Sequence, residues 1–164
     1  MKKKNLYIDF DGVILDTITP TYEEMEKENI HSVEEAKEFF KKYKWENVIN
    51  DKYIINNSID DIKEIINSEK FNLAILTHVN SLEEAILKIK YLRKYFKDIT
   101  IIPCPKEISK TKMVHTEDSI LVDDYAGNLR EWEKEKGIPV RFSRKGNGKG
   151  YIVVKRLKEL IELF

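Results

Sequence analysis

The segment LYIDFDGV, residues 6–13, runs an apolar strand directly into two carboxylates and a glycine. Burying charge at the end of such a strand is costly unless a partner compensates it, and a bound cation is the partner that we expect. Alternate side chains of a strand share a face, so Asp9 and Asp11 can belong to one site, where Gly12 permits the backbone to turn away. An ordinary Asp-Gly turn is the alternative interpretation.

Three later features place polar side chains where an alternating strand and helix chain would build a site. The apolar run Leu73–Thr77 ends in a hydroxyl, and the run Ile120–Asp124 ends in two carboxylates. Between these runs, Lys110 or Lys112 opens a short segment. Because open α/β sheets bind ligands beyond the carboxyl ends of their strands, we expect these groups to meet the two N-terminal carboxylates.

Strand and helix patterns alternate along most of the chain, which predicts an α/β protein with a Rossmann-like parallel sheet flanked by helices. Strands are expected near residues 5–10, 71–77, 98–102, 119–123 and 138–143. A helix begins at Ser81, whose spacing to Glu84 forms a capping box. The residues expected on its buried face are Leu82, Ala85, Ile86, Ile89 and Phe96. Another helix runs from about Gly127 to Gly137, a left-handed stop, and residues 152–164 are expected to form a closing helix.

Residues 17–69 interrupt this alternation, because they hold several helical patterns between the first and second strands. We interpret them as a helical insertion, and residues 1–16 and 70–164 as the core domain. Ser32 caps one helix of the insertion, and a helix from about Ser58 is expected to return to the sheet. The aromatic side chains of the insertion are Tyr22, Phe39, Phe40, Tyr43, Trp45 and Tyr53. They either form the insertion's own core or supply a stacking wall for a base.

The composition fits one domain and excludes several classes of protein. A chain of 164 residues can support one core and a small insertion. Lys and Arg total 29, as do Asp and Glu, so no net field favours a nucleic acid polymer or a membrane as partner. No stretch approaches a membrane span. The single cysteine, Cys104, excludes an internal disulfide and a cysteine metal cluster, and we expect a cytoplasmic protein.

Together, the polar positions resemble the four motifs of the haloacid dehalogenase (HAD) superfamily. The matching residues are Asp9 and Asp11, Thr77, Lys110 or Lys112, and Asp123 with Asp124. The resemblance spans most of the chain. It implies a HAD-like fold in which the insertion is a cap that covers the site and helps to select the substrate.

The resemblance also implies a reaction. Asp9 would be the nucleophile that forms an aspartyl-phosphate, and Asp11 the general acid and then the general base. Asp9, the Asp11 carbonyl and the second acidic strand end would hold Mg²⁺. Nearby like charge is expected to raise the pKa of Asp11, as a proton donor needs. Thr77 and the motif lysine would hold the phosphoryl oxygens.

Two choices remain within the motifs, one made from local spacing and one from the resemblance. In a helix after Ser109, Lys110 shares an inward face with the apolar residues three and four positions on, Met113 and Val114. Lys112 would point away, so we favour Lys110 as the motif lysine. Superfamily members with adjacent acids suggest the second acid, at position 124, as the direct metal ligand, with its neighbour acting through water.

The residue two positions after the nucleophile separates reaction types in this superfamily. An acid there, as at Asp11, favours a phosphatase over a dehalogenase. The motifs DFDGV and LVDDY, with Asn128, Leu129 and Trp132, are similar to the cytosolic 5′(3′)-deoxyribonucleotidase family, which implies a nucleoside monophosphate as substrate. Another small phosphorylated metabolite, such as a sugar phosphate or phosphoglycolate, is the alternative. A HAD-like binding module without turnover is a third possibility.

Two features are left outside the motifs. His78 follows Thr77 and is either a substrate contact or a structural histidine; the 3 histidines show no metal-ligand spacing. Residues 144–150 are rich in glycine and basic side chains but lack the Gly-Lys-Ser/Thr ending of a P-loop. We interpret them as a surface connection.

Overall fold

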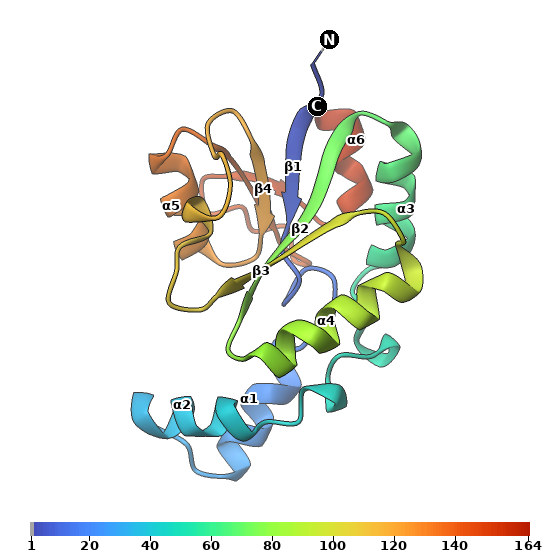
Figure 1. Ribbon diagram of the computed structural model, residues 1–164. Coiled ribbons are helices and arrows are strands. Elements are labelled where there is room, and N and C mark those ends of the chain that lie inside the picture. The colour runs from blue at the N-terminus through green and yellow to red at the C-terminus, as the bar shows by residue number, and fades with distance from the viewer. Residues whose placement is uncertain (1) are drawn as a thin grey trace.

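The computed structural model describes residues 2–164 and shows a parallel sheet between two layers of helices (Figure 1). The strands pair in the order β3-β2-β1-β4-β5-β6, and every pair is parallel. Their bounds are β1 Lys4–Ile8, β2 Phe71–Val79, β3 Thr100–Pro105, β4 Ile120–Asp123, β5 Ile138–Phe142 and β6 Ile152–Val154. The predicted Rossmann-like α/β class is therefore confirmed.

Helices cover both faces of the sheet, with bounds α3 Ser58–Ser68, α4 Leu82–Tyr95, α5 Ala126–Lys134 and α6 Leu160–Leu163. One face packs against α3, α4 and α6 in a core that includes Ile8, Ile75, Ile62, Leu92 and Leu160. The other face packs against α5 in a smaller core that includes Leu76, Cys104, Leu121, Leu129 and Trp132. All four residues of β4 are buried, as expected for a central strand with helices on both sides.

The order of the strands creates a crevice at one edge of the sheet. β2 and β3 lie on one side of β1, whereas β4, β5 and β6 lie on the other. The direction of winding therefore reverses between β1 and β4, and such a switch point opens a crevice beyond the carboxyl ends of the strands. Asp9 directly follows β1, and Asp123 ends β4. Both acids therefore lie at this crevice.

Residues 17–69, the inserted segment, begin with helices that lie beyond this edge (Figure 1). Before α3, its elements are α1 Ile18–Lys27, α2 Val33–Lys42 and the 3₁₀ turns η1 Trp45–Asn47 and η2 Asp51–Tyr53. The two legs of the segment pair: the Asp16 N–H donates to the Tyr53 carbonyl at 2.8 Å, and the Ile55 N–H to the Ile14 carbonyl at 3.0 Å. The helix predicted from Ser58, α3, packs against the sheet as expected.

Both predicted N-cap residues are confirmed, but the reciprocal contact of the Ser81 capping box is not, because the Glu84 side chain accepts from the Asn80 N–H. The predicted buried face of α4 is not confirmed either. Ser32 and Ser81 each accept a hydrogen bond from the backbone N–H three residues on. Leu82 is 77% exposed and Ile86 is 42% exposed, so their expected burial was wrong. The buried residues of α4 are Glu84, Ala85, Lys88, Tyr91 and Leu92. The helix turns two charged side chains inward because ionic partners are available at the crevice.

Three other expectations need correction. Ile152 begins a strand, so the closing helix is confined to the end of the chain. Lys136, not Gly137, has the left-handed conformation, with φ of 61°. Gly137 is required for space, because a Cβ there would collide with the indole of Trp132. β3 extends through two prolines to Pro105, which is tolerated because β3 lies at the edge of the sheet.

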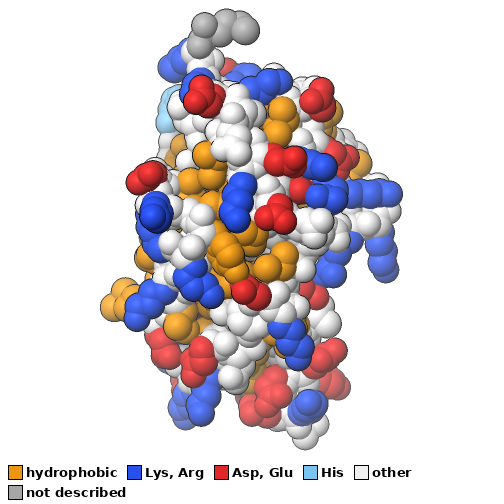
Figure 2. All heavy atoms as spheres, turned by 90° about the vertical axis from the view of Figure 1, so that its right-hand side faces the viewer, with side chains coloured by type: hydrophobic (Ala, Val, Ile, Leu, Met, Phe, Trp, Pro, Cys, Tyr) orange, Lys and Arg blue, Asp and Glu red, His pale blue; other side chains and the backbone are white. Residues whose placement is uncertain are grey.

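Acidic and basic side chains are intermixed on the side of the molecule shown in Figure 2. The zero net charge therefore reflects a mixed surface there rather than two separated patches of opposite sign. Within residues 2–164, every helix falls short of the length and apolar character that crossing a membrane requires.

Candidate active site

Three predicted carboxylates and one lysine meet beyond β1 and β4. Lys110 Nζ lies 2.7 Å from Asp9 Oδ1 and 2.8 Å from Asp123 Oδ2. Asp9, Asp123 and Asp124 each present a carboxylate oxygen, and these oxygens lie within 4.8 Å of one another. Lys110 is only 2% exposed and Asp123 is fully buried. Burial of so many charges is stable only when each has a partner of opposite sign.

The structure places Lys110, and not Lys112, among these acids. Lys110 opens the 3₁₀ turn η3, Lys110–Lys112, after the N-cap Ser109, whereas Lys112 is exposed. The spacing argument was correct for the lysine but wrong for Met113, which is 36% exposed. Lys110 points inward because its ammonium pairs with the acids, since the turn is too short to form an apolar face.

Burial and crowding perturb two of these acids, although Asp9 is paired with Lys110. Burial, and then repulsion by Asp123, raises the pKa of Asp9 to about 7. Burial, and then repulsion by Asp9, raises the pKa of Asp124 to about 9. Asp123 is engaged by Lys110, by the Tyr125 N–H at 2.9 Å and by Asn128 Nδ2 at 3.0 Å. Carboxylate oxygens that repel one another suit a hard divalent cation. Its charge would replace the protons that the raised pKa values otherwise keep on these acids.

Gly12 allows the backbone to leave β1 without obstructing this cluster. Its φ is +77°, a conformation that other L-residues rarely adopt. A Cβ at Gly12 would collide with the carboxylate of Asp124. The glycine predicted from the sequence is therefore required both for the turn and for the close approach of the second acidic strand end.

Asp11 contacts a residue that sequence reasoning missed. Lys88 of α4, 1% exposed, lies with its Nζ 2.7 Å from Asp11 Oδ2, and Thr17 Oγ1 donates to Asp11 Oδ1 at 2.6 Å. Burial alone would raise the pKa of Asp11, but Lys88 and Thr17 outweigh burial and lower it. The predicted rise was wrong because it considered only the neighbouring carboxylates. The missed signal was a lysine three residues after Ala85, on the buried face of α4.

Thr77 and His78 lie on β2 beside this group. Thr77 is fully buried, and its Oγ1 lies 2.9 Å from Lys88 Nζ. His78 lines the crevice, its Nε2 lies 2.8 Å from the Ile108 carbonyl oxygen, and burial lowers the pKa of its ring. One ring nitrogen therefore has a structural partner, while the ring itself borders the space above the acids.

A cleft of about 670 Å³ opens above the cluster, between the sheet edge and the inserted segment. Its floor includes Asp9, Asp11 and the second acidic strand end. Of the six aromatic residues singled out in the insertion, those that line the cleft are Tyr22, Phe40 and Trp45. Two of these rings pack against each other: Phe40 stacks on Trp45, with ring centroids 5.9 Å apart.

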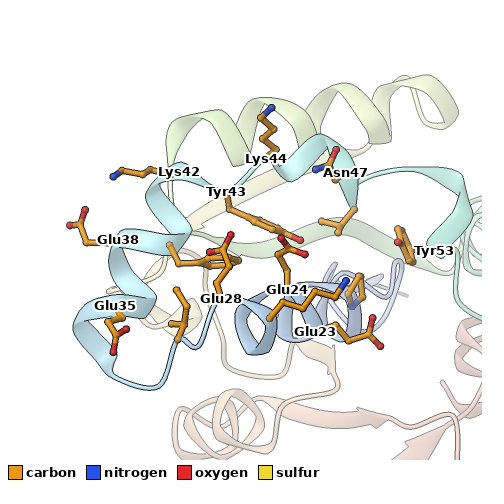
Figure 3. A pocket seen from close by; sticks show the side chains of 15 residues that line it. Glu23, Glu24, Glu28, Glu35, Glu38, Lys42, Tyr43, Lys44, Asn47 and Tyr53 are labelled. Atoms are coloured by element: carbon orange, nitrogen blue, oxygen red, sulfur yellow. The ribbon is translucent and has the colours of Figure 1, made fainter.

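A second groove, of about 810 Å³, lies within the inserted segment between α1 and α2. The other three aromatic residues, Phe39, Tyr43 and Tyr53, line it. Figure 3 shows Glu24 of α1 and Glu28, which directly follows α1, reaching toward Tyr43, with further glutamates and lysines around them. Acids and bases are mixed here, and the motif residues are all elsewhere, so the smaller cleft above Asp9 is the candidate active site.

No protein-family model matches the sequence, and a search of curated proteins finds no match. Solved structures do match. A hydrolase from Pseudomonas syringae has a TM-score of 0.69 at 13% identity, over 98% of this chain and 97% of that chain. The HAD-hydrolase YfnB from Bacillus subtilis, bound to magnesium, has a TM-score of 0.63 at 12% identity, over 99% of both chains.

A phosphatase has a similar architecture. The D,D-heptose 1,7-bisphosphate phosphatase from Burkholderia thailandensis has a TM-score of 0.59 at 13% identity, over 99% of this chain and 98% of that chain. At such low identities the likeness shows the fold. The chain therefore has the α/β fold of HAD hydrolases, in agreement with the resemblance seen in its motifs.

Proposed function

We propose that this protein is a Mg²⁺-dependent phosphomonoesterase that forms an aspartyl-phosphate on Asp9. One observation carries the proposal: Asp9, Lys110 and the two acids at the end of β4 converge at the switch point of a HAD-like sheet. A nucleophilic carboxylate beside a buried ammonium is suited to attack at phosphorus, because the cation offsets the repulsion between two anions.

The proposed reaction has two steps. In the first, an Asp9 oxygen bonds to phosphorus, the bond from phosphorus to the ester oxygen breaks, and Asp11 gives that oxygen a proton. In the second, water attacks the phosphorus of the aspartyl-phosphate, Asp11 takes a proton from the water, and Asp9 and inorganic phosphate are released. The carboxylate form that Lys88 favours suits the second step. In the first step, the negative charge of an incoming phosphate raises the pKa of Asp11 again, so that Asp11 can carry the proton that it donates.

Asp9, the Asp11 carbonyl and Asp124 are the groups that would hold Mg²⁺, with Asp123 acting through water. When bound, the ion neutralises charge on the phosphoryl group and keeps Asp9 ionised. Lys110 and Thr77 hold phosphoryl oxygens. Asp123 is already engaged by three donors, which is why its neighbour is the better candidate for direct coordination.

The substrate that we propose is a nucleoside monophosphate. The helices α1 and α2 act as a cap, and Tyr22, Phe40 and Trp45 offer aromatic surface to a base while the phosphate meets Asp9. His78 borders the same space. A specific observation favours a second candidate, a sugar phosphate: the cleft is also lined by polar groups that suit hydroxyls, among them Asn80, Lys106, Glu107 and Asn128.

Phosphate release from a panel of substrates tests the proposal. The panel contains deoxynucleoside and ribonucleoside 5′-monophosphates, sugar phosphates, phosphoglycolate and an aryl phosphate, with and without Mg²⁺, beside the Asp9→Asn variant. We expect Mg²⁺-dependent release that the variant abolishes, and highest kcat/KM for a nucleotide. A preference for sugar phosphates would select the second candidate. No release by the folded protein from any member would favour a binding module instead.

A further inference from the structure

Lys88 is an unusual residue for the middle of a helix that packs on a sheet. Its side chain is 1% exposed, and its Nζ lies 5.1 Å from the centre of the Phe10 ring. A buried ammonium is costly unless it is paired and hydrogen-bonded. An apolar residue at this position would fill the same volume without that cost. The lysine is therefore best explained by what its charge contacts.

Four acceptors surround this ammonium. Asp11 Oδ2 lies at 2.7 Å, Thr77 Oγ1 and the His78 carbonyl oxygen each at 2.9 Å, and Glu84 Oε2 at 2.6 Å. An ammonium has only three protons, all of them donors. Lys88 thus joins the strand end of the first motif to the strand end of the second through one group.

Glu84 fixes the position of this ammonium. It is one turn before Lys88 on α4, and its side chain is 2% exposed. Its other oxygen, Oε1, accepts from the Asn80 N–H at 2.8 Å and from Asn80 Nδ2 at 3.0 Å. The carboxylate is thereby held from both sides, so the lysine cannot easily leave Asp11.

The direction of the hydrogen bonds from Lys88 affects both Thr77 and Asp11. Because Lys88 can only donate, Thr77 Oγ1 accepts from it. The hydroxyl proton of Thr77 points to the His78 carbonyl oxygen at 3.3 Å, a long hydrogen bond that a phosphoryl oxygen would replace. Asp11 has one oxygen on Lys88 and the other on Thr17, so its carboxylate plane is fixed between α4 and the start of α1. We propose that Lys88 is a positioning residue, which orients Asp11 for proton transfer and Thr77 for phosphoryl binding. This inference rests on the proposed phosphatase function.

The test compares phenyl phosphate with 4-nitrophenyl phosphate, which are similar in size but differ in how much their leaving oxygen needs a proton. We expect Lys88→Met to lower kcat/KM for phenyl phosphate about 10-fold more than for 4-nitrophenyl phosphate, because general acid catalysis contributes most where the leaving group is poor. Thr77→Ala should lower both equally. Lys90→Met, at an exposed position of the same helix, should leave both unchanged.

Each outcome of this comparison supports or overturns the positioning role of Lys88. Equal losses on both substrates, or no loss, in a Lys88→Met variant with native circular dichroism would overturn the positioning role. Should that variant not fold, the Glu84→Gln/Lys88→Met double variant avoids an unpaired buried carboxylate and is judged by the same ratio. If the wild type releases no phosphate in the presence of Mg²⁺, the proposed function itself fails, and the role of Lys88 falls with it.

Discussion

Lys110 donates a hydrogen bond of 2.7 Å to Asp9, although the two residues are 101 positions apart in the sequence. The pair is buried, and the same ammonium also contacts Asp123 at 2.8 Å. Any reaction at Asp9 therefore takes place next to a fixed positive charge.

Loss of that charge should abolish most of the activity. We expect Lys110→Ala to lower kcat roughly 100- to 1,000-fold, the range typical for removal of one preorganised donor to a developing charge. Lys112→Ala is the matched control, because Lys112 is exposed on the same turn. Steady-state phosphate release measures both. Similar losses in the two variants would contradict the assignment of Lys110.

Affinity for Mg²⁺ should rise with pH. The raised pKa of Asp124, about 9, means that a proton occupies the metal-free site at neutral pH, and the ion must displace it. Between about pH 6 and pH 9, the apparent affinity should increase up to about tenfold per unit for each proton released. Calorimetric titration at several pH values measures this, with Asp124→Asn as the control that weakens binding. An affinity independent of pH would contradict the prediction.

Gly12→Ala should damage the metal site more than the fold. The added Cβ collides with the Asp124 carboxylate and also meets an unfavourable φ of +77°. We expect Mg²⁺ binding and phosphate release to fall at least about 10-fold, with a loss of unfolding free energy of about 1 to 3 kcal/mol from the strained backbone. Urea unfolding and metal titration separate the two effects. Normal metal binding in the variant would show that Asp124 is not a ligand.

The exposed ring of Tyr22 should bind the base of a nucleotide substrate. Stacking contributes about 1 to 3 kcal/mol per base, so Tyr22→Ala should raise KM for the preferred nucleotide roughly 5- to 150-fold. Tyr22→Phe keeps the ring and should leave KM close to that of the wild type. Because Tyr22 is 61% exposed, neither change should affect folding. Equal KM values for all three proteins would place the base elsewhere in the cleft.

Asp61 and Arg156 link α3 to the end of the chain, far from the reaction. Arg156 donates twice, from Nε at 2.9 Å and from its terminal nitrogen at 2.6 Å, to a carboxylate that is 1% exposed. Arg156→Met leaves that charge unpaired and should lower the free energy of unfolding by about 2 kcal/mol. Lys41→Met, in an exposed pair with Glu38, should change it by less than about 0.5 kcal/mol. Urea unfolding measures both, and an Arg156 variant as stable as the wild type would refute the link.

Much of the site could be predicted because its polar residues directly follow the apolar runs that form strands. Asp9, Thr77 and Asp123 each follow an apolar run, and parallel strands place their carboxyl ends at one edge whatever the details of packing. Lys110 was favoured over Lys112 from its spacing to two apolar residues, although the expected helix is only a 3₁₀ turn. These inferences need only local pattern and the geometry of a parallel sheet.

Long-range electrostatics could not be predicted in this way. Whether the pKa of Asp11 rises or falls depends on Lys88, which is 77 positions away and reaches Asp11 only because α4 rotates its charged face toward the crevice. The exposure of Leu82 follows from the same rotation. Helical periodicity alone favours the apolar residues on such a face and gives no reason to bury an ammonium.

The sequence by itself determined the strands β1 to β5, the order of the motifs and the identity of the acids, because these depend on apolar runs and on the residues that end them. Only the tertiary structure decided which aromatic rings of the inserted segment line the cleft and which cation faces Asp11. Those outcomes depend on the packing of α1, α2 and α4 against the crevice, where the burial of each charge requires a partner from a distant part of the chain.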